Sequence, residues 1–63
     1  MVAYINYTKY MNKMGIKIVT NDGIYNSFFT EGVEGTPNAL LLMERLIKDG
    51  YELRFIVWNE KGE

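Results

Sequence analysis

Residues 16–29 read IKIVTNDGIYNSFF, and this segment determines much of the architecture. Two runs rich in β-branched and aromatic residues, 16–20 and 24–29, lie on either side of the triplet NDG at 21–23. Asn, Asp and Gly tolerate the positive φ that a tight turn requires, whereas Val, Ile and Phe favour extended strands. The segment therefore predicts a β-hairpin whose strands are joined by residues 21–23.

A loop and a helix are expected after the hairpin. Residues 30–35, TEGVEG, contain two glycines and two glutamates, a composition that predicts a mobile loop. Thr36 is the expected N-cap of a helix that starts at Pro37, where the missing N–H costs nothing. Gly50 is expected to end this helix, because glycine readily adopts the left-handed conformation found just after a helix.

The predicted helix is amphipathic, with most of its apolar residues on one side. Leu41 departs from this pattern, because its neighbours on the helix surface are charged. A single exposed leucine is common in soluble proteins. The apolar side consists of Ala39, Leu42, Met43, Leu46 and Ile47, with Leu40 at its margin.

The segment 51–58, YELRFIVW, has the alternation that is typical of a strand. A right-handed crossover through the helix is expected to place this strand beside the first strand of the hairpin, giving an antiparallel three-stranded order. Its side chains divide into two faces: Tyr51, Leu53, Phe55 and Val57 on one, and Glu52, Arg54, Ile56 and Trp58 on the other.

Residues 2–14 have two interpretations. As a helix, which we favour, the segment places Ala3, Tyr7, Tyr10 and Met14 on one face. As a strand, it is supported by its β-branched residues and by the lack of an N-cap. The fold prediction is a single small α+β domain spanning residues 1–63, with a three- or four-stranded antiparallel sheet, one main helix and the order (α or β)-β-β-α-β.

Composition restricts the chemistry that the chain can perform. Of its 63 residues, 48% are hydrophobic and 14% aromatic, so the chain has enough apolar surface to fold. Cysteine and histidine are absent, which excludes disulfides, thiolate nucleophiles, imidazole bases and zinc sites built from these residues. No catalytic residue, metal ligand or cofactor is predicted, and the chain is expected not to be an enzyme.

Size and charge indicate the kind of partner. A domain this short, without a disulfide or metal, commonly gains stability by oligomerising, which predicts a homodimer. The net charge of −1 makes a nucleic-acid partner unlikely on sequence grounds, because nucleic-acid-binding domains usually carry a basic excess. The N-terminus does not resemble a secretory signal, and no apolar stretch is long enough to span a bilayer, so an intracellular location without membrane contact is expected.

The second face of the sheet is the main functional clue in the sequence. The face away from the helix is expected to be too apolar to remain in contact with water, and the N-terminal segment, a second copy or another protein are the three candidates to cover it. The residues expected beneath the helix are Ile16, Ile18, Ile24, Phe28, Leu53, Phe55 and Val57. Those expected on the second face are Val19, Tyr25, Phe29, Ile56 and Trp58, with Lys17 and Arg54.

These observations predict a small non-enzymatic interaction or inhibitor protein that binds itself as a homodimer and also binds another protein. Small accessory proteins of phages and other mobile elements often have these properties. Two alternatives remain: an oligomer that sequesters a small ligand such as a nucleotide, and a single-stranded nucleic-acid-binding module that stacks bases on the aromatic sheet face. The predicted interaction surface consists of Tyr25, Phe29, Arg54, Ile56, Trp58 and Leu41.

Overall fold

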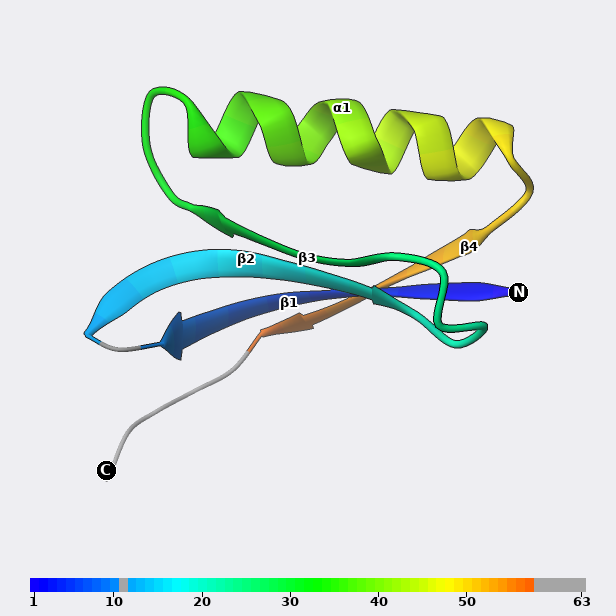
Figure 1. The fold of residues 1–63 in the computed structure, drawn as a ribbon, viewed down its shortest axis with the longest axis horizontal. Coiled ribbons are helices and arrows are strands. Elements are labelled where there is room, and N and C mark those ends of the chain that lie inside the picture. The colour runs from blue at the N-terminus through cyan, green and yellow to red at the C-terminus, as the bar shows by residue number, and fades with distance from the viewer. Residues whose placement is uncertain (11, 58–63) are drawn as a thin grey trace.

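The computed structural model describes residues 1–10 and 12–57, excluding the side chains of Tyr10 and Val57. It consists of one sheet with a helix along one side of it (Figure 1). This arrangement confirms the predicted α+β class with one main helix. The elements are β1 (Val2–Tyr10), β2 (Lys13–Thr20), β3 (Asn26–Thr30), α1 (Gly35–Lys48) and β4 (Glu52–Val57).

The sheet is mixed rather than wholly antiparallel, and its strand order is β3-β2-β1-β4. β2 pairs antiparallel with both β1 and β3, whereas β4 pairs parallel with β1. The prediction that the last strand lies beside the first strand of the hairpin is therefore wrong. β2 has no free edge, because β1 occupies the position that was expected for β4.

The N-terminal segment is a central strand, so the favoured helix interpretation of residues 2–14 is wrong and the strand interpretation is confirmed. Ala3 and Ile5 are fully buried, whereas Tyr4 and Asn6, which alternate with them, are only half-buried. This period of two is the pattern of a strand. Pairing on both sides satisfies the backbone of β1, and such tertiary pairing outweighs a weak local helix preference.

The hairpin formed by β2 and β3 is confirmed, but its loop is one residue longer than predicted. The Thr20 N–H donates to the Tyr25 carbonyl over 3.1 Å, so residues 21–24 form the loop. A one-residue shift turns every side chain of a strand to the opposite face. Tyr25 and Phe29 consequently pack beneath α1, whereas Phe28, paired with Lys17, lies on the opposite face.

The first turn of α1 differs from the prediction. Glu34 precedes the helix as its cap residue, and no side-chain hydrogen bond caps it. The prediction that Thr36 is the N-cap is wrong, because Thr36 lies within the helix and its hydroxyl accepts a hydrogen bond from the Gly32 N–H at 3.3 Å.

The C-terminal end of α1 confirms the prediction for Gly50. Gly50 has a φ of 92°, in the left-handed region that favours glycine. Its N–H donates to the Ile47 carbonyl at 3.1 Å, and the Tyr51 N–H donates to the Leu46 carbonyl at 3.0 Å. These two bonds form a Schellman motif, which directs the chain from the helix into β4.

The core lies between α1 and the helix-facing side of the sheet. Ile47, which was expected on the buried side of the helix, is mostly exposed, because it lies beyond the strip of α1 that contacts the sheet. Ile24, expected beneath the helix, is exposed in the hairpin loop. The buried apolar residues are Ala3, Ile5, Ile16, Ile18, Ala39, Met43, Leu46 and Tyr51.

A polar network joins the hairpin loop to the beginning of β4. The Tyr51 hydroxyl donates to one carboxylate oxygen of Asp22, and the Thr20 hydroxyl donates to the other at 2.7 Å. The Tyr51 ring also meets Tyr25 edge-to-face, with ring centroids 6.1 Å apart. Hydrogen bonding to Thr20 and Tyr51 lowers the pKa of Asp22, and the bond to Asp22 raises the pKa of Tyr51 to about 12.

The Tyr51–Asp22 bond makes the stability of the fold dependent on pH. Because the folded pKa of Tyr51, about 12, exceeds its ordinary value of 10.0, its contribution is complete below pH 10 and is lost as the pH rises toward 12. We expect the urea midpoint of the wild type to fall over this range, and Tyr51→Phe to lack that component of the fall. Tyr4→Phe, on the opposite face, should retain it; identical profiles for the two variants would contradict this account.

At acid pH the stability of the fold changes with pH in the opposite direction. The lowered pKa of Asp22 contributes stability above its ordinary value of 3.8, and this contribution is lost as the pH falls through the folded value. Asp22→Asn should therefore reduce the acid dependence of the urea midpoint.

Candidate interaction surface

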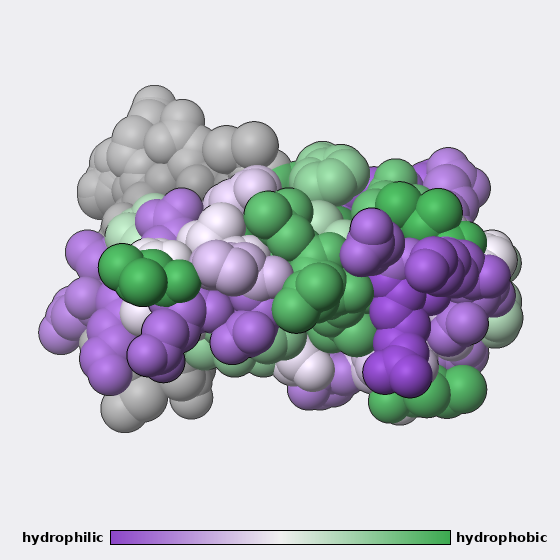
Figure 2. All heavy atoms as spheres, turned by 90° about the horizontal axis from the view of Figure 1, so that it is seen from above, coloured by the Kyte–Doolittle hydropathy of each residue, from purple (hydrophilic) through white to green (hydrophobic). Residues whose placement is uncertain are grey.

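An apolar groove runs between α1 and β4 on the helix side of the molecule. Its volume is about 610 Å³. Leu40, Ile47 and Phe55 are 57%, 59% and 59% exposed. Figure 2 shows this side of the molecule, where hydrophobic side chains gather over the middle part. The residues that line the groove are Pro37, Leu40, Leu41, Met43, Glu44, Ile47, Leu53 and Phe55.

The groove exists because the apolar arc of α1 is wider than its contact with the sheet. Ala39, Met43 and Leu46 face the sheet and are buried. Leu40 and Ile47, seven positions apart, share a neighbouring strip of the helix surface. Phe55 belongs to the helix-facing side of β4, but β4 is the edge strand and the helix does not cover this ring.

The outer edge of β4 has no neighbouring strand within the described part of the chain. The Glu52 N–H donates to the Met1 carbonyl at 2.8 Å, so the backbone of Glu52 is directed toward β1. Backbone groups alternate in direction along a strand, and those of Leu53 and Phe55 therefore point away from the sheet. An edge of this kind is a template for pairing with another strand.

Charged side chains flank this edge on the face away from the helix. The Arg54 Nε lies 3.2 Å from the Glu52 Oε2, and both side chains are more than half exposed. An exposed pair of this kind contributes only about 0–1 kcal/mol to stability. Glu52 and Arg54 are thus available for stronger contacts with a partner.

The face of the sheet away from α1 carries part of the predicted surface. Arg54 and Ile56 lie on it, as expected, together with Lys17 and Val19. Tyr25 and Phe29 do not, so the prediction that they project from this face is wrong. Trp58 lies outside the described residues.

Phe28 is the aromatic residue of β3 that lies on this face, where Tyr25 and Phe29 were expected. A Cβ added to Gly15 would lie 2.3 Å from the Phe28 Cζ, so this ring covers the Gly15 backbone. The N-terminal segment, one of the three candidates to cover this face, does not cover it, because that segment is β1 within the sheet. None of the described elements lies over the face.

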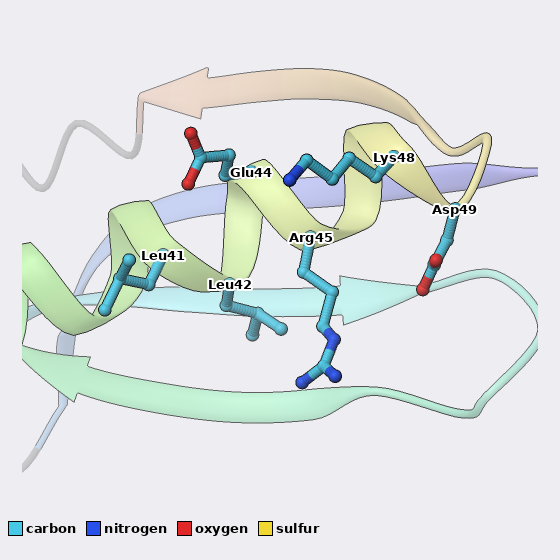
Figure 3. Close-up of a pocket in the computed structure, with 6 residues that line it drawn as sticks. All are labelled: Leu41, Leu42, Glu44, Arg45, Lys48 and Asp49. Carbon is cyan, nitrogen blue, oxygen red and sulfur yellow. The ribbon is translucent and has the colours of Figure 1, made fainter.

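Leu41 is exposed on the outer surface of α1, as expected. It borders a shallow depression of about 540 Å³, which is also lined by Leu42 and by the charged residues Glu44, Arg45, Lys48 and Asp49 (Figure 3). Glu44 and Lys48 lie on the β4 side of the helix, whereas Arg45 extends toward β3. These side chains diverge, so they do not form an enclosed site, and Leu41 is best described as part of the rim of the α1–β4 groove.

The described polar groups offer little for catalysis. No cluster of three metal-binding side chains occurs within residues 1–10 and 12–57. Asp22 is ionised and Tyr51 is protonated at neutral pH, because their pKa values shift away from neutrality in opposite directions. These two groups hold the loop in place, and neither is suited to transfer a proton near pH 7.

Sequence reasoning placed Leu40 at the margin of the helix and Phe55 beneath it, and it did not find the groove. The available signal was the number of apolar positions on the helix, which exceeds what one strip can bury.

Comparison of the chain with protein-family models, with curated proteins and with solved structures finds no match. α1 has neither the length nor the apolar character of a membrane-spanning helix.

Proposed function

We propose that this chain is a small non-enzymatic protein-binding domain and that it acts inside the cell by occupying a surface of another polypeptide. The observation that supports this is the combination of exposed apolar side chains with an unpaired strand edge. A strand added to β4 forms hydrogen bonds with the backbone of Leu53 and Phe55 and covers the α1–β4 groove. Inhibition of the bound protein is the simplest consequence of such contact.

The structure gives less support to the two alternative functions. Base stacking was expected to use Tyr25, Phe29 and Trp58. Tyr25 and Phe29 pack beneath the helix instead, and Trp58 lies outside the described residues. A nucleotide is ordinarily bound in a concave site that buries most of its surface. The groove is lined largely by apolar side chains, and among the described residues that line it Glu44 alone is charged. This lining suits an apolar peptide surface better than a phosphate.

Paired substitutions in the groove test the proposed function. Ile47→Ser combined with Phe55→Ser is expected to weaken binding of protein partners, including untagged copies of this chain, by about tenfold or more, because each side chain loses its apolar contact. The measurement is recovery of bound protein by the tagged variant from lysate of the native host, followed by titration of the recovered protein.

The matched control is Ile24→Ser, since Ile24 is 69% exposed but lies in the hairpin loop outside the groove. This control should bind as the wild type does. All three substituted side chains are exposed, so the free energy of unfolding should change by only about 0.5 kcal/mol per site. Equal recovery with the wild type and the groove variant would refute the proposed function.

A further inference from the structure

We infer that the partner at the α1–β4 groove is a second copy of this chain, joined by antiparallel pairing of the two β4 strands about a two-fold axis at Leu53. This inference rests on the proposed function, because it names the occupant of the same surface. The axis turns two open edges into one continuous sheet.

The backbone of β4 fits this pairing. The N–H and C=O groups of Leu53 point away from β1, so two Leu53 residues on the axis exchange a pair of hydrogen bonds. The Phe55 N–H then faces the carbonyl of Tyr51 of the partner subunit. The Tyr51 N–H is already bonded to Leu46 and takes no part in this pairing.

Charge complementarity selects the position of the axis. Residues directly opposite one another in an antiparallel pair share a face, so the axis passes through a residue. With Leu53 on the axis, Glu52 lies opposite the partner's Arg54, and the same contact occurs a second time by symmetry. With Arg54 on the axis, two guanidinium groups face each other, which is unfavourable. With Phe55 on the axis, Arg54 faces the partner's Ile56 and gains no charged partner.

The same axis brings the apolar surfaces together on the helix side. Leu53 lies against the partner's Leu53. Phe55 lies opposite the backbone of the partner's Tyr51, whose ring is buried in the core of its own subunit. The exposed ring of Phe55 is thereby brought to the interface, where the partner shields it more than α1 does. The two grooves meet across the axis, and their Ile47 and Leu40 side chains border a single apolar surface.

The opposite edge of the sheet lacks these features. β3 is a strand of five residues whose helix-facing positions include the polar Ser27. The apolar groove on the helix side is lined by residues of α1 and β4 and by none from β3. β3 carries no charged residue, so charge and apolar surface both favour β4 as the interface.

Charge reversal tests both the dimer and its register. We expect the wild type to be a dimer by sedimentation equilibrium, and Glu52→Arg and Arg54→Glu each to raise the dissociation constant about tenfold, because each turns two attractive pairs into repulsive ones. The double variant E52R/R54E should return to within about threefold of the wild type, since both pairs are restored with their charges exchanged. An equimolar mixture of the two single variants should form a heterodimer.

Other outcomes overturn the inference in distinguishable ways. If the axis were at Arg54, Glu52→Arg would leave the dissociation constant unchanged. Arg54→Glu would also change it little, because two like charges would face each other in the variant as in the wild type. Dimerisation that is insensitive to all three variants but lost in Phe28→Ser would place the interface on the opposite face of the sheet. A wild-type monomer at about 1 mM would exclude the second copy; recovery of a different protein through Ile47 and Phe55 would then still support the proposed function.

Discussion

Gly35→Ala is expected to destabilise the fold by about 2 kcal/mol or more, although alanine is normally the better helix former by about 1 kcal/mol. A Cβ on Gly35 would lie 1.5 Å from the carbonyl oxygen of Thr30 and 2.6 Å from its carbonyl carbon. These are backbone atoms at the end of β3, so the clash is relieved only if the helix or the strand shifts. Urea unfolding followed by circular dichroism measures the loss.

Asn38→Ala is the control for Gly35→Ala. Asn38 is exposed in the same helix, and its replacement by alanine should leave the free energy of unfolding unchanged or raise it by a few tenths of a kcal/mol. A lower free energy of unfolding for Gly35→Ala than for Asn38→Ala would show that the loss comes from the close approach of α1 to β3 and not from alanine in the helix. If Gly35→Ala were as stable as the wild type, the segment between β3 and α1 would have to move without cost.

Local signals were sufficient to predict part of the fold. The NDG triplet at 21–23 indicated the hairpin, and Gly50 correctly marked the end of the helix, because turn and cap residues act through their own backbone conformation. Residues 2–10 were different, since their spacing fits one face of a helix while their β-branched residues favour a strand. Pairing with β2 and β4, which are distant in sequence, decided between the two.

The predicted face of two residues of the interaction surface was wrong because it depended on the strand register. One additional loop residue moved Tyr25 and Phe29 to the helix side, whereas Arg54 and Ile56 were placed correctly. The groove itself depends on which strands α1 covers, and this is a property of the strand order. Because β4 was expected beside the first strand of the hairpin, it could not be predicted from the sequence that α1 leaves Phe55 uncovered.

The central position of β1 leads to the second large effect, because Ile5 is fully buried between its register partners Ile18 and Phe55. Ile5→Ala is expected to cost about 2–5 kcal/mol, the range for truncation of a buried aliphatic side chain. A domain of this size has a total stability of roughly 3–9 kcal/mol. The variant should therefore lose a large part of its free energy of unfolding, seen as a lower urea midpoint or, where the cost exceeds the total stability, as loss of the cooperative urea transition.

Ile56→Ala removes the same atoms from a position that is 44% exposed on the other face of the sheet, and it should cost about 1 kcal/mol or less. Ile5→Val, expected to cost about 0.5–1.5 kcal/mol, keeps the chain folded and gives a measurable value if Ile5→Ala does not fold. The helix interpretation of residues 2–14 placed Ile5 away from the face formed by Ala3, Tyr7 and Tyr10. Equal losses of unfolding free energy for Ile5→Ala and Ile56→Ala would thus contradict a buried central β1. They would also contradict the placement of β4 at an open edge, because that placement depends on β1 being the neighbour of β4.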